Sequence, residues 1–194
     1  MIDVGLLAAG RGVRFGSDEP KQLAQLGGRP LVAHALDAAR GSGVGPVIVV
    51  VSDDRVAAVA DAEVVRNPEP EAGIASSLVA LLHALTPRAE VEAVVVGLAD
   101  QPLVGAEAYR RVAAADAPLA VATYGGRRGN PVRIAREHWP EALELAGDEG
   151  ARVLLRKYGA TEVRCDDTGD PTDVDTPADL AALESSWRSR TASE

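Results

Sequence analysis

Short apolar runs alternate with amphipathic segments along the first half of the chain. The runs at 4–9, 44–52 and 93–98 are almost entirely apolar, which is typical of strands buried on both faces of a parallel sheet. Between them, 31–41 and 74–85 place their apolar residues at helical spacing. Strand, helix and strand in this order form the βαβ unit of a parallel sheet, so the pattern predicts an α/β fold.

The remaining segments extend this pattern and add one turn between adjacent strands. Glycines in the middle of 117–134 predict two strands joined by a turn, and Gly147 divides 138–159 into two helices. We expect a single domain over 1–188, followed by a polar tail at 189–194. The other predicted elements are helices at 53–61 and 106–116, an edge strand at 62–67 and a last strand at 161–167.

Composition narrows the function classes. The 194 residues carry a formal net charge of −9, which argues against a nucleic-acid or anionic-membrane binder because such proteins present a basic face. The single cysteine, Cys165, excludes an intrachain disulfide and a cysteine metal cluster, and is expected in the core. His34 has no second histidine at ligand spacing, so it should be packed or solvated. No leader pattern or membrane-length apolar run is present, and we expect a cytoplasmic protein.

A glycine-rich, basic loop follows the first apolar run. Glycines allow positive φ and let backbone N–H groups approach an anion, while arginine and lysine add charge, so the loop suits a polyphosphate. An ordinary strand-to-helix turn with solvated arginines would have the same composition. Neither the G-x-G-x-x-G dinucleotide fingerprint nor a G-x-x-x-x-G-K-[ST] phosphate loop is present. The loop residues concerned are Gly10, Arg11, Gly12, Arg14, Gly16 and Lys21.

Carboxylates occur where the ends of predicted strands should meet. Asp100 lies just beyond the strand at 93–98, at the sheet edge where open α/β sheets bind ligands. In an extended segment, Asp173 and Asp175 would point to the same side of the chain. Carboxylate oxygens are suitable ligands for a hard cation such as magnesium. A turn or helix cap would also explain Asp100, and capping explains Thr176 fully.

Several stretches resemble one family of enzymes. LLAAGRGVRFG with PKQL, LADQP, GDEGARVLL and DVDTPADL occur in the order seen in the MobA-like nucleotidyltransferases, and they are most similar to the molybdenum cofactor cytidylyltransferase branch. The departures are Gly12 where serine is common, Phe15 where methionine is common, and Asn130 where histidine is usual. The resemblance implies a three-layer α/β/α fold with a Rossmann-like, mainly parallel sheet of the nucleotide-diphospho-sugar transferase type.

The resemblance also implies a reaction: magnesium-dependent transfer of CMP from CTP to a phosphorylated acceptor, molybdenum-bound molybdopterin in this branch, with release of pyrophosphate. The catalytic residues would be Arg14, Lys21 and Asp100, and the Mg2+ ligands would be Asp100 and Asp175. The nucleotide-binding residues would be Leu7, Ala8, Ala9, Gly10, Arg11, Gly12, Lys21, Gly73 and Ser77. The acceptor-binding residues would be Asn130, Pro131, Asp148 and Arg152.

Other interpretations stay open. Gly73 and Ser77 would also serve as helix caps, Arg152 would also suit a surface ion pair, and 117–134 a solvated hairpin. Within the family, GTP could replace CTP, and a sugar or polyol phosphate could replace the pterin. The alternatives from other classes are a nicotinamide-dependent reductase and a non-catalytic nucleotide-binding protein that delivers cofactor to a molybdoenzyme or chaperone partner.

Overall fold

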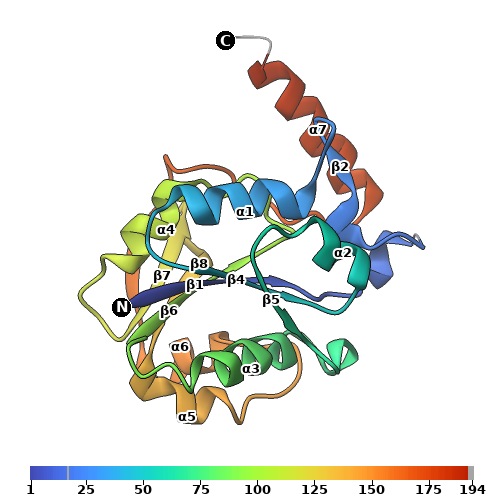
Figure 1. Ribbon diagram of the computed structural model, residues 1–194. Coiled ribbons are helices and arrows are strands. Elements are labelled where there is room, and N and C mark those ends of the chain that lie inside the picture. Colours follow the sequence, from blue (N-terminus) through green and yellow to red (C-terminus); the bar gives the residue numbers. More distant parts are fainter. Residues whose placement is uncertain (17, 192–194) are drawn as a thin grey trace.

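A seven-stranded, mostly parallel sheet forms the centre of the molecule (Figure 1). The computed structural model describes residues 1–16 and 18–191. The strands of this sheet are β1 Ile2–Ala8, β4 Val47–Val51, β5 Glu63–Arg66, β6 Ala93–Leu98, β7 Leu119–Tyr124, β8 Arg127–Ala135 and β9 Thr161–Arg164. Their order is β5-β4-β1-β6-β8-β7-β9, and only β8 runs antiparallel to its neighbours.

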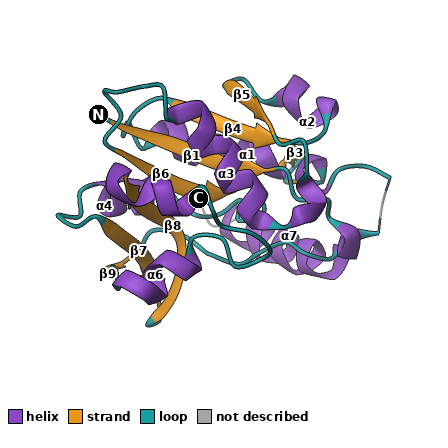
Figure 2. Cartoon of the chain, turned by 90° about the horizontal axis from the view of Figure 1, so that it is seen from below, coloured by secondary structure: helices purple, strands orange, loops and turns teal. Residues whose placement is uncertain are grey.

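Helices cover both faces of the sheet. They are α1 Leu31–Gly41, α2 Asp54–Val59, α3 Ile74–Leu85, α4 Ala106–Ala113, α5 Trp139–Ala142, α6 Arg152–Tyr158 and α7 Pro177–Thr191, with short 3-10 turns at Val13–Phe15, Lys21–Leu23, Pro70–Ala72 and Arg136–His138. α1 and α4 lie on one face, and α3, α5 and α6 lie on the other (Figure 1, Figure 2). Leu78, Leu81 and Leu82 of α3 are buried in the core because its apolar positions recur on one side. The predicted three-layer α/β/α fold is confirmed.

A small hairpin and the last helix form an addition that the apolar pattern does not predict. β2 Gln25–Leu26 and β3 Arg29–Pro30 pair antiparallel, whereas Gly27, Gly28 and Pro30 in the sequence predict only a turn. α7 contacts this hairpin and projects from the body of the molecule (Figure 1). His34 is a packing residue: its Nε2 lies 2.8 Å from the carbonyl oxygen of Leu26, and its ring packs edge to face with Trp187.

The start of α7 has the cap that its sequence predicts. Thr176 Oγ1 accepts a hydrogen bond from the Asp179 N–H at 3.2 Å, and the Asp179 carboxylate accepts one from the Thr176 N–H at 2.7 Å. Pro177 is the first helical residue, where its missing N–H costs nothing. The predicted polar tail at 189–194 begins inside this helix, and 192–194 lie outside the described residues.

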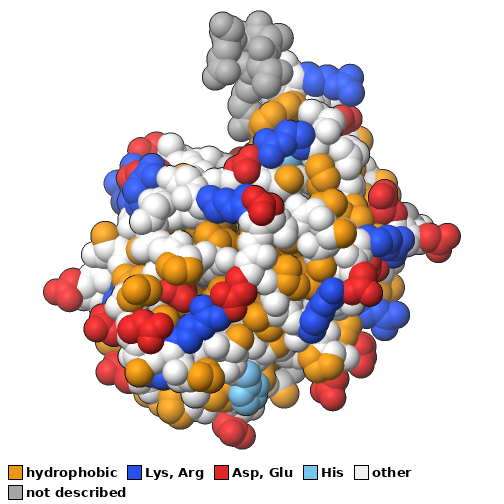
Figure 3. All heavy atoms as spheres, in the orientation of Figure 1, with side chains coloured by type: hydrophobic (Ala, Val, Ile, Leu, Met, Phe, Trp, Pro, Cys, Tyr) orange, Lys and Arg blue, Asp and Glu red, His pale blue; other side chains and the backbone are white. Residues whose placement is uncertain are grey.

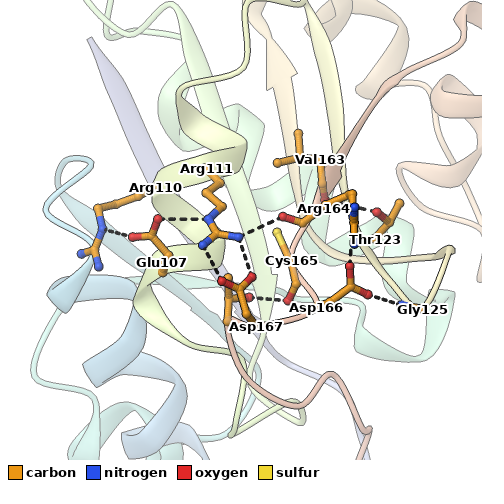
Figure 4. Close-up of polar contacts among 11 residues, drawn as sticks. Glu107, Arg110, Arg111, Thr123, Gly125, Val163, Arg164, Cys165, Asp166 and Asp167 are labelled. Carbon is orange, nitrogen blue, oxygen red and sulfur yellow. Dashed lines mark hydrogen bonds and ion pairs between the residues drawn. The ribbon is translucent and has the colours of Figure 1, made fainter.

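Polar contacts tie the end of β9 to α4 and to the β7–β8 turn (Figure 4). Arg111 Nη1 lies 2.7 Å from Asp167 Oδ1, and the Gly125 N–H donates to Asp166 Oδ1 at 2.5 Å. Cys165 is fully buried between them, as predicted, and burial raises the pKa of its thiol. These contacts fix the start of the segment that returns from β9 toward the middle of the sheet.

Charged side chains of both signs are interspersed on the surface, as Figure 3 shows for one face. Several are paired, for example Arg29 with Asp37 at 2.7 Å and Arg55 with Asp53 at 2.8 Å. Among the residues described, no helix has the length and apolar character needed to cross a membrane.

Candidate active site

The glycine-rich loop leaves the carboxyl end of β1 and folds back toward Lys21. Gly12 has a φ of 59° and Gly16 a φ of 68°, a left-handed conformation that favours glycine. A Cβ atom on Gly12 would lie 2.9 Å from the Cβ of Lys21, so a side chain there would also force the loop apart. In this chain the backbone therefore requires glycine at position 12, where the family that the sequence resembles commonly has serine.

Two side chains fix the peptide groups of this loop. Ser52 Oγ donates to the carbonyl oxygen of Ala9 at 3.0 Å, and Gln22 Nε2 donates to that of Gly10 at 2.7 Å. These bonds tie the loop to the residues that follow β4 and to the turn that carries Lys21. Sequence reasoning missed both residues: Gln22 lies inside the PKQL stretch, whereas Ser52 has no signal beyond its place after a strand.

Lys21 lies between two carboxylates beneath the loop. Its Nζ is 2.9 Å from Asp100 Oδ2 and 3.1 Å from Asp175 Oδ1, and 7% of its side chain is exposed. Arg14 Nη2 lies 3.0 Å from the other oxygen of Asp175. Burial alone would lower the pKa of the Lys21 ammonium, but the charges and hydrogen bonds of Asp100 and Asp175 outweigh it, so this pKa is raised. The four predicted charged residues thus form one cluster.

A paired segment brings Asp175 to this cluster. Residues 168–174 lie along the loop 100–105 like a short added strand, held by backbone and side-chain hydrogen bonds. Val174 is fully buried, which turns Asp173 and Asp175 to the opposite side, as an extended segment predicts. The backbone bonds run from Val174 N to Asp100 O at 2.8 Å, from Asp170 N to Leu103 O at 2.9 Å, and from Gly105 N to Thr168 O at 2.9 Å.

Two adjoining cavities meet near the cluster. The loop cavity has a volume of about 500 Å³ and is lined by the glycine-rich loop, the start of α3, Lys21, Asp100 and Asp175. The arginine cavity has a volume of about 360 Å³, with an apolar floor that includes Val96 and Val121. Three arginines also line it: Arg128, Arg152 and Arg156. The residues common to both linings are Leu7, Ile74, Leu98 and Asp148.

Glycine is also required in the wall between the two cavities. Gly73, with a φ of 93°, precedes α3 and faces the loop before α6. A Cβ atom there would lie 2.5 Å from Asp148 Oδ1 and from the carbonyl carbon of Gly147. The Ala75 N–H donates to the Gly147 carbonyl at 3.0 Å, so the start of α3 and this loop are held together. Gly73, predicted to bind the nucleotide, and Asp148, predicted to bind the acceptor, are therefore neighbours.

Most predicted site residues line one of these cavities. Those on the loop cavity are Leu7, Ala9, Gly10, Arg11, Gly12, Arg14, Lys21, Gly73, Ser77, Asp100 and Asp175. Those on the arginine cavity are Asn130, Asp148 and Arg152.

The structure places two predicted residues, Ala8 and Pro131, away from these linings. Side chains alternate along β1, so Ala8 faces a smaller neighbouring cavity of about 270 Å³. Pro131 is buried in β8 behind Asn130, to which a cis peptide bond joins it.

Sequence reasoning also missed two of the three arginines on the arginine cavity. Arg156 follows Arg152 by one helical turn, a spacing that the sequence carries. Its Nη2 pairs with Glu149 at 2.6 Å. Arg128 lies in the β7–β8 hairpin, and its Nε pairs with Glu162 at 2.8 Å. Each of these guanidinium groups is therefore paired with a carboxylate, and Glu149 itself lines the cavity.

Comparison with known proteins agrees with this architecture. A model of the MobA-like NTP transferase domain matches residues 4–163. The chain belongs to the MobA-like NTP transferase family. The matched region includes the glycine-rich loop, Lys21 and Asp100, and it ends before the segment that carries Asp175.

One group of sequence relatives of this MobA-like chain consists of longer proteins. Over 161 residues the chain is 37% identical to the bifunctional protein GlmU of Paracoccus denitrificans, an alignment that covers 77% of this chain and 35% of that protein. The chain spans about a third of the length of such curated relatives.

Solved structures match the MobA-like chain along nearly its whole length. The Rv0371c homologue from Mycobacterium sp. strain JC1 superposes with a TM-score of 0.82 and 31% identity, over 95% of this chain and 96% of that one. The complex of Rv0371c with manganese from Mycobacterium tuberculosis H37Rv superposes with a TM-score of 0.75 and 28% identity, over 95% and 98%. This family fold therefore extends over nearly the full chain.

Proposed function

We propose that the protein is a nucleotidyltransferase that transfers CMP from CTP to a phosphorylated acceptor, molybdenum-bound molybdopterin, and releases pyrophosphate. The observation that carries the proposal is the charged cluster of Arg14, Lys21, Asp100 and Asp175 beside two adjoining cavities. The loop cavity suits a triphosphate, and the arginine cavity suits an acceptor with a planar ring, whose face can pack on the apolar floor, and a phosphate. Two substrates bound in this way would meet near the cluster.

The transfer itself requires little covalent chemistry from the protein. An oxygen of the acceptor phosphate would form a bond to the α-phosphorus of CTP. The bond from that phosphorus to the oxygen shared with the β-phosphorus breaks, and pyrophosphate leaves. The attacking oxygen is already ionised, so no general base or enzyme-bound intermediate is needed. Arg14 and Lys21 would bind the triphosphate and stabilise the charge that develops on the leaving group.

Asp100 and Asp175 fit a divalent cation, which we propose to be Mg2+. Both carboxylates already bind the same ammonium group, that of Lys21, so they converge on one cationic position. Asp100 Oδ1 is buried and has no hydrogen-bond partner among the described residues. When bound, the cation supplies charge neutralisation for the triphosphate. The manganese complex of the similar Rv0371c supports a divalent metal.

Ligands from the substrate would complete the coordination of this cation. Within the part of the chain that the structure describes, no three histidine, cysteine, aspartate or glutamate side chains form a group able to hold a metal. Hard cations of this kind often share protein carboxylates with phosphate oxygens and water. We therefore expect the metal to bind together with the nucleotide.

Pyrophosphate release tests this function. The wild-type protein with CTP and molybdenum-bound molybdopterin should release pyrophosphate, and Asp100→Ala should lower the rate by about 100- to 1,000-fold while the fold is retained. Asp116→Ala is the matched control, because Asp116 is exposed and lies in the loop before β7.

Each contrary result points to a specific alternative. Normal release by Asp100→Ala would overturn the assignment of the cluster. Release with GTP but not CTP would change the nucleotide and keep the mechanism. Nucleotide binding without release, with the acceptor supplied, would favour a cofactor-delivery protein.

A further inference from the structure

Asn67 is a buried polar residue directly after β5, and the proposed roles leave it unused. Only 4% of Asn67 is exposed, and its backbone N–H donates to the carbonyl oxygen of Val51 at 2.8 Å. It does not belong to the lining of the loop cavity but borders a separate one, of about 290 Å³, on the other side of α3. Any effect of Asn67 on a ligand in the loop cavity must therefore pass through its neighbours.

The hydrogen bonds of Asn67 fix the orientation of its side-chain amide. The Glu69 N–H donates to Asn67 Oδ1 at 2.9 Å, and a backbone N–H can only donate. The oxygen must therefore face Glu69, and the NH2 group must face the start of α3. There Nδ2 donates to Ser76 Oγ at 2.8 Å and to Ser77 Oγ at 3.0 Å.

The two serine hydroxyls differ in where their own proton goes. A hydroxyl has one proton to donate, besides the lone pairs that accept. Ser76 donates its proton to the carbonyl oxygen of Gly73 at 2.8 Å. For Ser77, which lines the loop cavity, the described residues offer no acceptor for this proton.

We propose that Asn67 is a positioning residue for nucleotide binding. Its amide occupies a lone pair of the Ser77 hydroxyl, so that the Ser77 proton is directed into the loop cavity and donated to an oxygen of the bound nucleoside triphosphate. The inference rests on the proposed function, because it takes the loop cavity to be the triphosphate site. Ser76 also accepts a hydrogen bond from this amide, but it donates its own proton to Gly73 and so cannot donate it to the nucleotide.

A double-mutant cycle on nucleotide affinity tests this proposal. Asn67→Asp keeps the size of the side chain and the bond from Glu69, but its carboxylate would accept the Ser77 proton and withdraw it from the cavity. Calorimetric titration with CTP and with GTP, each with Mg2+, should show affinity about tenfold weaker for Asn67→Asp. In a Ser77→Ala background the same change should cost no more than about twofold to threefold, because the proton is already missing.

Ser76→Ala provides the matched control, since Ser76 binds the same amide. In that background Asn67→Asp should still cost about tenfold. Equal losses in the wild-type and Ser77→Ala backgrounds would overturn the proposal, because a structural or purely electrostatic effect of Asn67 does not depend on the Ser77 proton. Melting temperatures of all variants confirm that the affinities refer to folded protein.

The two serines alone give a second test if Asn67→Asp does not fold. Ser77→Ala should weaken nucleotide binding severalfold, and Ser76→Ala should leave it nearly unchanged. Equal affinities for these two variants would overturn the positioning role. If the wild-type protein binds neither CTP nor GTP, the proposed function fails together with this inference, whereas binding with an additive cycle overturns the inference alone.

Discussion

Two aspartates lie at opposite ends of the central strands, and each has a buried carboxylate oxygen that no described residue hydrogen-bonds. Asp3 lies near the start of β1, is 1% exposed, and has Arg88 Nη1 at 3.8 Å. Asp100 follows β6 and has Lys21 Nζ at 2.9 Å. Asp100 lines the loop cavity and shares the Lys21 ammonium with Asp175. Asp3 borders none of the cavities described above.

The comparison shows that a buried carboxylate indicates a site only when its surroundings can exchange one cation for another. Burial raises the pKa of the Asp3 carboxyl, and the distant Arg88 only partly opposes this. Asp3 is therefore a local cost to stability. At Asp100 the same kind of oxygen lies beside the Lys21 ammonium, a second carboxylate and an open cavity, which together suit a charged ligand.

Among the changes that test the contrast between Asp100 and Asp3, removing the Lys21 ammonium should have the largest effect on stability. Lys21→Met leaves Asp100 and Asp175 together, with Arg14 as the remaining ion-pair partner of Asp175. Because both carboxylates are partly exposed, we expect a loss of ~2 kcal/mol in the free energy of unfolding. Added Mn2+ should restore most of it by taking the place of the ammonium. Urea unfolding with and without Mn2+ measures both effects.

Lys157→Met is the control for this experiment, because Lys157 pairs with Glu141 on the surface at 2.9 Å. Its stability should change little, because an exposed ion pair contributes little to folding, and it should not respond to Mn2+. If Mn2+ stabilises Lys21→Met no more than it stabilises the control variant, the two carboxylates do not form a shared cation position.

Moving Asp175 away from Asp100 should leave Asp100 without a second carboxylate beside it, as Asp3 is. A Cβ atom on Gly105 would collide with the carbonyl oxygen of Thr168, so Gly105→Ala should push residues 168–174 away from their loop. We expect about 1–3 kcal/mol lower stability in urea unfolding, and a marked loss of Mn2+ affinity in calorimetry with CTP present. Gly41→Ala is the control, since the nearest atom to its Cβ would lie at an ordinary 3.6 Å. Unchanged Mn2+ affinity in Gly105→Ala would show that the pairing does not position Asp175.

The smallest effect is expected at Asp3 and depends on pH. The folded-state pKa of Asp3 is raised, so the unfolded chain releases this proton more readily, and stability falls as pH rises from the unfolded value, about 3.9, toward the folded one. Asp3→Asn should remove that fall. Relative to wild type, the variant should gain about 1 kcal/mol in the free energy of unfolding between pH 3 and neutral pH. Urea unfolding at each pH measures this gain. A constant difference over this range would mean that Asp3 has an ordinary pKa in the folded protein.

Much of the fold could be predicted because each element depends on nearby residues. The apolar run at 93–98 and the one-sided leucines of 74–85 carry their own signal, and both elements match the structure. The β2–β3 hairpin was not predictable in this way, because two residues per strand are too few to show an alternation. It packs against α7, far along the chain, as well as against the nearby α1.

The candidate site was predictable as a set of residues but not as a set of contacts. Arg14, Lys21, Asp100 and Asp175 were identified from local motifs and the resemblance. That Lys21 would bind both acids could not be read from the sequence, since it is 154 positions from Asp175. Asn67 is a second example: as part of a loop sequence it has no chemistry of its own, and its importance depends on the two serines opposite it.

The position of Asp175 also sets an order of events during synthesis. The seven strands of the central sheet lie before residue 165, so a growing chain could complete its hydrophobic framework while Asp175, the second acidic residue of the cluster, is still missing. The cluster can form only after 168–174 emerges and pairs with 100–105. A nascent or truncated chain that lacks this segment would therefore carry the strands of the sheet but not the complete charged cluster.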